Sequence, residues 1–461
     1  MADFLPTRQD LGRALDWLGA RAGEAWRTAE SLIGRRHLRL GITGLSGAGK
    51  TVFTTSLVHA LRHAGARPHA MPLFAAAAGS APLSATVTAL GDLPRFPYEA
   101  NLAGLLESAP RWPPPTERLC GVRIILAQGN DASRTLTVDI VDYPGEWLLD
   151  LELLRLDYPA WSAASLARLA GGEGVAAAES EAWRAAASTL DDADALVAGH
   201  RDLLLRLRGH GLRHLQPGRV LAPGDRPPTP DEIPVPLPAS RANDAIFAAM
   251  AARYDAYRTR HVEPFFREHF ARLDRQIVLV DMIGALARGP EVLADTEAAL
   301  ESVLASFRYH RIAWLDWFRS RIDRVLVAAT KVDHVTTSQY LNLRSLLGQR
   351  FETSAWREAI AADRLRFDVL SALRATTDGW LRRDGVQQAA IRGMLKDPQG
   401  GLRSLVPSDI PAVPPARDAW PAGGFVFFDF APPDLDAFAQ APLPNVNLDK
   451  ALDYLIGDRL T

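Results

Sequence analysis

The chain has 461 residues, a single cysteine and a formal net charge of −2 at pH 7. This length predicts more than one domain, and the near-neutral charge excludes an overall basic field that would collect nucleic acid or acidic membranes. The lone Cys120 excludes an internal disulfide and fits a reducing compartment. We find no apolar signal-peptide core and no run of about 18 apolar residues, so we expect a cytoplasmic protein without a transmembrane segment.

The N-terminal segment, residues 1–36, is predicted to be helical over 8–33, where leucines and a tryptophan recur at helical spacing. Its polar face carries acidic as well as basic residues, so we expect it to dock on its own domain. With the basic residues 35–37 it also permits peripheral contact with a membrane. A strand over 37–43 follows, and the next helix runs from Val52 onward.

The rest of the chain alternates between apolar runs typical of strands and stretches typical of helices. Residues 65–117 are predicted to be irregular apart from a short helix near 98–108. Residues 146–272 are predicted to be mostly helical, and the proline-rich loop 216–240 inside them cannot be helix or inner strand. Strands are predicted at 120–128, 135–142, 275–281, 324–330, 366–371 and 424–430, and further helices at 291–308, 337–361 and 448–458.

Several of these strands are apolar without alternation, which is typical of a mostly parallel sheet covered on both faces. The predicted fold is therefore an α/β P-loop NTPase core with an inserted all-helical domain. The predicted division is an N-terminal segment, 1–36, a first part of the core, 37–145, the helical insertion, 146–272, and a second part of the core with the C-terminal strand and helix, 273–461.

A phosphate-binding loop is predicted between the first strand and its helix. Gly44–Thr51 matches the pattern G-x-x-x-x-G-K-[ST], whose glycines let backbone N–H groups point at phosphate oxygens. Lys50 is expected to reach the β- and γ-phosphates, and the Thr51 hydroxyl to bind Mg²⁺. The predicted phosphate-binding residues are Gly44, Ser46, Gly47, Ala48, Gly49, Lys50, Thr51 and Val52.

Such a site needs an acidic residue near the metal, and two D-x-x-G segments compete for this role. Asp142 and Asp281 each follow an apolar strand, with Gly145 and Gly284 three residues later. We favour Asp142, because Thr116 stands just before the preceding hairpin, and this order matches the switch segments of Ras-like GTPases. Thr116 is then a second Mg²⁺ ligand, and the Gly145 N–H senses the γ-phosphate.

The base is predicted to be guanine rather than adenine. Thr330–Asp333 resembles the [NT]-K-x-D motif, in which the Asp333 carboxylate accepts from two guanine N–H donors and the Lys331 stem packs on the base. Ser371 and Ala372, which follow the run RFDVL at the end of the strand predicted over 366–371, resemble the S-A motif that supports the base through a backbone N–H.

Hydrolysis is predicted to be slow. Ras-like GTPases carry a glutamine after the glycine of the D-x-x-G motif, and this chain carries Glu146. A carboxylate beside the γ-phosphate is electrostatically unfavourable unless it is protonated or turned away. An arginine can compensate in cis or from a partner, and Arg111, five residues before Thr116, is the candidate in cis.

The motifs together resemble the YcjX family of bacterial P-loop GTPase-like proteins over roughly residues 10–460, and the phrase "DYPGEWLLDL" is specific to it. The resemblance implies a Ras-like core with added helices, a cytoplasmic location that permits contact with the inner membrane, and partners in envelope or phage-shock stress. The expected activity is a slow GTPase switch that uses GTP, GDP and Mg²⁺ and binds no nucleic acid. The alternatives are a nucleotide-bound scaffold with negligible hydrolysis and an ATP-using P-loop protein.

Overall fold

The computed structural model describes residues 35–307 and 322–460, apart from 46, 80–81, 130–134, 172–173, 384 and 398. The helix predicted over 8–33 therefore lies outside the described residues. The same holds for Ser46 of the phosphate-binding loop and for most of the turn predicted between the strands at 120–128 and 135–142.

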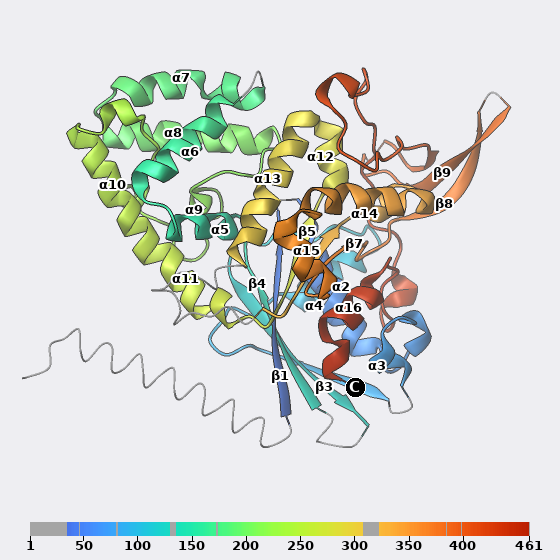
Figure 1. Cartoon of the computed structure of the whole chain (residues 1–461). Helices are drawn as coiled ribbons and strands as arrows, with labels where there is room; N and C mark the ends of the chain where they lie inside the picture. Colours follow the sequence, from blue (N-terminus) through green and yellow to red (C-terminus); the bar gives the residue numbers. More distant parts are fainter. Residues whose placement is uncertain are drawn as a thin grey trace, which may run out of the picture.

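A seven-stranded sheet forms the centre of the molecule (Figure 1), with strand order β2-β3-β4-β1-β5-β6-β7. β1 pairs in parallel with β4 and β5, and β6 pairs in parallel with β5 and β7, whereas β3 is antiparallel to both of its neighbours. The predicted α/β fold with a mostly parallel sheet is thus confirmed. The strands are β1 (Arg35–Gly44), β2 (Leu83–Thr88), β3 (Cys120–Gln128), β4 (Thr135–Asp142), β5 (Arg275–Val280), β6 (Arg324–Ala329) and β7 (Leu365–Val369).

Helices cover both faces of this sheet, and the run 277–280 of β5 shows why a strand in it can be apolar without alternation. Ile277 and Leu279 join a hydrophobic cluster with α2 and α16, whereas Val278 and Val280 join the cluster that contains α13 and α14. The apolar side chains of β5 are therefore buried on both faces of the sheet. Its two polar residues are buried as well and keep hydrogen-bond partners: Arg275 donates to the Asp323 and Asp458 carboxylates, and Gln276 accepts from the Tyr143 hydroxyl. The helices outside the long helical segment are α2 (Lys50–His63), α3 (Ala75–Ala78), α4 (Tyr98–Leu105), α12 (Met282–Arg288), α13 (Pro290–Ser306), α14 (Tyr340–Gly348), α15 (Ser354–Ala361) and α16 (Leu448–Ile456).

The segment between β4 and β5 is helical, as predicted, and gathers beside the sheet in green and yellow-green (Figure 1). One hydrophobic cluster includes Val141 of β4 together with Trp161 and Tyr254 of this segment. Because the core is continuous across residues 146 and 272, the predicted division into domains stays a prediction. The helices here are α5 (Glu146–Leu149), α6 (Tyr158–Ala170), α7 (Val175–Thr189), α8 (Ala193–Gly209), α9 (Gly218–Leu221), α10 (Ala245–Tyr257) and α11 (Glu263–Glu268).

Several predicted elements are corrected by the structure. The proline-rich loop contains a turn of α-helix, α9, because Gly218–Leu221 lie between its prolines, and a 3-10 turn over Pro230–Glu232. The helix predicted over 337–361 is two helices, α14 and α15. The strand predicted over 424–430 is wrong, since within it only Phe430 forms an isolated bridge, to Leu395.

Two features of the sheet structure were not predicted. β2 lies within the segment expected to be irregular and forms the edge of the main sheet next to β3. A second, three-stranded antiparallel sheet consists of β8 (Thr376–Arg383), β9 (Val386–Met394) and β10 (Leu402–Leu405). Its hairpin β8–β9 projects from the body of the molecule (Figure 1).

The parallel strands place their following loops at one edge of the sheet. Gly44 of β1 lies opposite Leu279 of β5, and Ala329 of β6 lies opposite Val280 of β5 and Val369 of β7. The carboxyl edge of an open parallel sheet is where such folds bind ligands. In the described part of the chain, no helix has the length and apolarity needed to cross a membrane.

Candidate functional site

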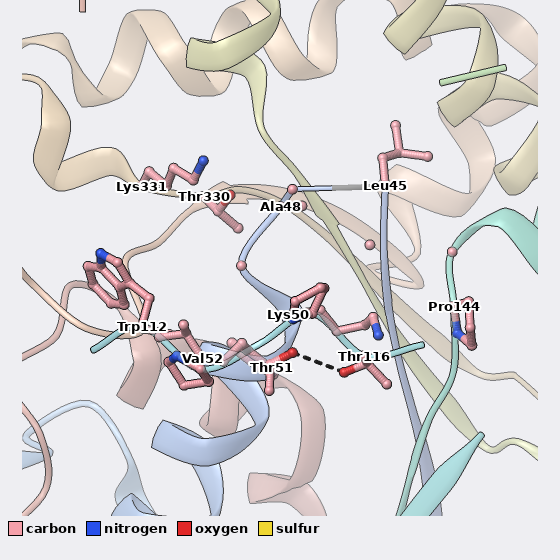
Figure 2. Close-up of a pocket in the computed structure, with 18 of the residues that line it drawn as sticks. Leu45, Ala48, Lys50, Thr51, Val52, Trp112, Thr116, Pro144, Thr330 and Lys331 are labelled. Atoms are coloured by element: carbon pink, nitrogen blue, oxygen red, sulfur yellow. Dashed lines mark hydrogen bonds between the residues drawn. The ribbon is translucent and has the colours of Figure 1, made fainter. Parts of the chain in front are cut away.

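A cavity of about 800 Å³ opens at the carboxyl edge of the sheet (Figure 2). Its walls come from the loops that follow β1, β4, β6 and β7, and from the segment that precedes β3. The end of α8, the proline-rich loop and residues near the second sheet complete them. The predicted site residues that line it are Gly44, Gly47, Ala48, Gly49, Lys50, Thr51, Val52, Thr116, Gly145, Glu146, Lys331, Asp333, Ser371 and Ala372.

The glycine-rich loop has the strand–loop–helix context that its pattern predicts. β1 ends at Gly44 and α2 begins at Lys50. Gly47 and Gly49 have φ angles of 83° and 76°, a region that residues with a Cβ rarely adopt. The chain therefore turns tightly between the strand and the N-terminus of the helix, whose partial positive charge faces the loop.

Lys50, Thr51, Thr116 and Asp142 converge below this loop. The Lys50 ammonium donates to Asp142 Oδ1 at 2.8 Å, and the Thr116 hydroxyl donates to Asp142 Oδ2 at 3.2 Å. The Thr51 and Thr116 hydroxyl oxygens lie 3.0 Å apart, as the dashed line in Figure 2 marks. Asp142 is fully buried, and burial raises its pKa, while Lys50 and the hydroxyl donors oppose that rise.

The chemistry of this group fits Mg²⁺. Two hydroxyls and one carboxylate are hard oxygen donors, and Mg²⁺ is usually held by one or two carboxylates together with ligand phosphates and water. Across residues 35–307 and 322–460, with their short gaps, no cluster of three His, Cys, Asp or Glu side chains has metal-binding geometry. A metal here would therefore need phosphate oxygens to complete its shell.

Asp281 does not join this group. Its carboxylate accepts from the Gly284 N–H at 2.8 Å, which caps α12, and from the Lys331 ammonium at 2.5 Å. Burial alone would raise the Asp281 pKa, but the Lys331 charge and these hydrogen bonds outweigh it and lower the pKa. Of the two competing aspartates, it is Asp142 that the fold brings to Lys50 and Thr116.

The Thr330–Asp333 motif lies at the other end of the cavity. Asp333 is 2% exposed, and its Oδ2 accepts from the Ala375 N–H at 2.7 Å. Lys331 occupies this end as well, as does Trp112, whose ring lies beside Val52 in Figure 2. This end of the cavity thus combines a fixed carboxylate, an aliphatic lysine stem and an indole ring.

Ser371 and Ala372 line the same end of the cavity, but their backbone N–H groups differ in whether they are available to a ligand. The Ser371 N–H donates to Val446 O at 3.0 Å, and its hydroxyl donates to Leu373 O at 2.9 Å. Ser371 is therefore held by its own loop and by the segment before α16. The N–H of this pair that suits a ligand is that of Ala372.

The loop after β4 touches the phosphate-binding loop directly. A Cβ on Gly145 would lie 2.1 Å from the carbonyl oxygen of Gly44, so only glycine fits here. Glu146 follows in the cavity wall, and the Trp147 indole N–H donates to Ala222 O at 2.7 Å. A change at Gly145 can therefore reach the proline-rich loop through Trp147.

Some lining residues were not predicted from the sequence. Trp112 had a usable signal, since it is an aromatic residue four positions before Thr116. Arg208 had none, because it is one of several arginines in a leucine-rich helix. The cavity residues that sequence reasoning missed include Trp112, Arg118, Arg208, Leu221, Ala222, Pro223, Gly224, Asp225, Lys396, Asp429 and Phe430.

Arg111 is not brought to the cavity. Its side chain is 72% exposed and forms an i,i+4 ion pair with Glu107, with Nη2 2.6 Å from the carboxylate. This pair holds the guanidinium at the surface, outside the cavity wall. The geometry therefore gives no support to Arg111 as an arginine acting in cis.

Comparison with known proteins identifies the family. The model of the YcjX-like family, DUF463, matches residues 38–460. The chain belongs to this YcjX-like family. It is 38% identical to the Ras-like GTPase YcjX of Escherichia coli K12 over an alignment that covers 92% of this chain and 96% of the relative. It is also 34% identical to the Ras-like GTPase YcjX of Shewanella oneidensis MR-1 over an alignment that covers 94% of this chain and 97% of that protein. The expected family is thus confirmed, and the site described above lies within the part of the chain that the family shares.

Proposed function

We propose that this YcjX-like chain binds guanine nucleotides in the 800 Å³ cavity and hydrolyses GTP slowly to GDP and phosphate. One observation carries the proposal: the phosphate-binding loop, the Thr51–Thr116–Asp142 group and the Thr330–Asp333 motif line or adjoin a single cavity. The names of the two relatives, both Ras-like GTPases, support the same activity.

At the phosphate end, Lys50 and the loop N–H groups bind the β- and γ-phosphates. Lys50 already lies in a desolvated position, with its side chain 10% exposed, so its charge acts in a low dielectric. Thr51, Thr116 and Asp142 hold Mg²⁺. The metal neutralises charge on the phosphate oxygens when it is bound. The Gly145 N–H donates to the γ-phosphate and reports its presence.

At the base end, Asp333 accepts from the N1–H and N2–H₂ groups of guanine, a pair of donors that adenine lacks. The Ala372 N–H donates to the base carbonyl. The Lys331 stem packs on one face of the purine, and the Trp112 ring is available for the other. Because Ala375 fixes one Asp333 oxygen, the carboxylate is preorganised before the base arrives.

Two features favour a slow switch over a fast enzyme. Glu146 stands where a neutral glutamine orients water in Ras-like GTPases, and its charge opposes the approach of the γ-phosphate. Loss of the γ-phosphate releases Gly145, and the bond from Trp147 to Ala222 carries that change to the proline-rich loop. We propose that this conformational change is read by a protein partner in a cytoplasmic branch of the bacterial envelope stress response.

The Asp333→Asn variant tests the proposal without removing a buried side chain. The asparagine carbonyl oxygen still accepts from the Ala375 N–H. The asparagine NH₂ group then faces the N–H donors of guanine, so two donors oppose each other without an acceptor. Xanthine has a carbonyl at that position of the ring. We therefore expect Asp333→Asn to lose about 100-fold or more in GTP affinity and to gain XTP binding, since each unmatched hydrogen bond costs about 1–3 kcal/mol.

The assay is competition by GTP, XTP and ATP against a fluorescent nucleotide, followed by hydrolysis on the same samples. Unchanged GTP preference in Asp333→Asn would contradict the assigned base contact. Equal binding of ATP by the wild type would favour an ATP-using protein. Tight GTP binding without turnover would favour a nucleotide-bound scaffold.

A further inference from the structure

Two arginines line the cavity within the described ranges, and they differ in how they are held. Arg118 lies at the mouth, 59% exposed, with its guanidinium 3.7 Å from the Asp225 carboxylate. Arg208 is half-buried in the last turn of α8, and its Nη1 donates to Leu221 O at 2.9 Å. Arg208 is therefore a partly buried cation supplied by the helical segment, and one hydrogen bond fixes only part of its five-donor fork.

Arg208 lies at the phosphate end of the cavity. It and Glu146 line both the main cavity and a small recess beside it, and Leu45 of the phosphate-binding loop does the same. None of the base-end residues Lys331, Asp333 or Ala372 lines that recess. The guanidinium is thus on the side of the loop where the γ-phosphate and Glu146 meet.

Arg213 holds the turn that carries Arg208. Its Nη1 donates to the carbonyl oxygens of Arg208 and Leu212 at 3.4 and 3.3 Å. Its Nη2 approaches to 3.9 Å from the position that a Cβ on Gly47 would take. Arg213 therefore lies between the end of α8 and the phosphate-binding loop, whereas Arg208 lines the main cavity.

We propose that Arg208 is a catalytic arginine supplied in cis, whose guanidinium contacts the γ-phosphate and the β–γ bridging oxygen in the transition state of GTP hydrolysis. This inference rests on the proposed function. In that reaction the oxygen of water bonds to Pγ, and the bond from Pγ to the bridging oxygen breaks with its electron pair passing to GDP. One water proton stays on the inorganic phosphate, and the other is released to solvent. The arginine donates to oxygens on which negative charge develops.

Arg208 also explains how the site accommodates Glu146. A carboxylate next to the γ-phosphate adds to a polyanionic site, and the Arg208 and Arg213 guanidiniums, which line the same recess as Glu146, offset that charge. The planar fork donates to two phosphate oxygens at once, which a lysine ammonium does less well. Leu45 and Leu221, which line the recess, keep the local dielectric low and strengthen these contacts.

The test compares Arg208→Ala and Arg208→Lys with the matched control Arg206→Ala. Arg206 lies on the same helical turn but pairs at the surface with Glu179, with Nε 2.9 Å from the carboxylate. The readouts are GDP affinity, single-turnover GTP hydrolysis and binding of aluminium fluoride to the GDP complex, which imitates the transition state.

We expect Arg208→Ala to keep GDP affinity, to lose aluminium fluoride binding and to hydrolyse GTP about 10³-fold more slowly, the lower end of the effect of such arginines. Arg208→Lys should recover part of the rate, and Arg206→Ala should match the wild type. If Arg208→Ala no longer binds GDP, the test rests on Arg208→Lys, whose aluminium fluoride binding and hydrolysis rate are compared with those of the wild type in the same way.

A wild-type rate with retained aluminium fluoride binding in the Arg208 variants would overturn the assignment while leaving the proposed GTPase intact. An equal loss in Arg206→Ala would also overturn it, because the effect would then belong to the helix. A wild-type protein that binds no guanine nucleotide would overturn both the assignment and the proposed function.

Discussion

Replacing Trp147 with phenylalanine tests whether the loop after β4 is anchored to the proline-rich loop. Trp147 is 4% exposed, and its indole N–H donates to Ala222 O at 2.7 Å. The Arg219 guanidinium lies 3.7 Å from the centre of its ring. Trp147→Phe keeps an aromatic ring but leaves the Ala222 carbonyl unpaired and weakens the cation–π contact.

The expected loss follows from these two contacts. An unpaired buried carbonyl costs about 1–3 kcal/mol, and a desolvated cation–π pair contributes up to about 2 kcal/mol, part of which phenylalanine keeps. We therefore expect the free energy of unfolding to fall by about 3 kcal/mol in Trp147→Phe. Urea titration followed by far-ultraviolet circular dichroism measures this without using the fluorescence of the residue that changes.

Trp183→Phe is the matched control. Trp183 is 6% exposed, but its N–H lies 3.4 Å from Leu196 O, a long and weak hydrogen bond. We expect this variant to lose about 1 kcal/mol, the usual net value of one hydrogen bond. If Trp147→Phe loses no more than Trp183→Phe, then the bond to Ala222 is not an anchor, and the proposed path from Gly145 fails.

Three further predictions concern Asp150, Thr116 and Gly145. Burial raises the pKa of Asp150 from 3.8 to about 6, so the folded protein favours the protonated carboxyl. This preference adds about 3 kcal/mol to the free energy of unfolding below pH 3.8, and the contribution is lost as the pH rises through 6. Asp150→Asn should remove this fall from a plot of unfolding free energy against pH. Thr116→Ala, or EDTA in the wild type, should weaken GTPγS binding about 10- to 100-fold, and Thr116→Ala should leave GDP affinity nearly unchanged, because Thr116 serves the state with a γ-phosphate. Gly145→Ala should weaken GTPγS and GDP alike by about tenfold or more, because its Cβ would displace the Gly44 carbonyl in the phosphate-binding loop.

Controls for these variants come from positions without such contacts. A Cβ on Gly379 would meet nothing within 4 Å, so Gly379→Ala should bind nucleotides as the wild type does. Thr189 bonds only a carbonyl of its own helix and serves as the control for Thr116. A pH profile of Asp150→Asn parallel to that of the wild type would contradict the pKa argument. Equal losses of GDP and GTPγS in Thr116→Ala would remove the assigned γ-phosphate role.

The elements that could be predicted from the sequence are those whose residue pattern fits only one kind of secondary structure. The apolar run IVLV of β5 is buried on both faces of the sheet, and this run identifies the strand in the sequence. The choice of Asp142 over Asp281 came from the order of motifs, and the fold brings Asp142 to Lys50 as that order requires. Local chain order carries this information because each motif follows its own strand.

What could not be predicted depends on contacts between distant parts of the chain. Arg208 lines the cavity and bonds Leu221 O, whereas Arg206 pairs with Glu179 at the surface, and these distant contacts are not encoded locally in the sequence. The strands β8–β10 carry polar and small residues on both faces, so their period is weak. The run at 424–430 has the composition of a strand, but its backbone pairs with a neighbouring segment at a single bridge, Phe430 to Leu395, and forms no strand.

The central claim is that the cavity between Lys50 and Asp333 selects a guanine nucleotide. The most direct measurement is equilibrium binding of GDP, GTPγS and ATP analogues to the full chain with Mg²⁺. The account predicts tight binding of both guanine nucleotides and at least about 100-fold weaker binding of ATP, because adenine offers Asp333 no matching pair of donors. Equal or tighter binding of ATP would contradict it.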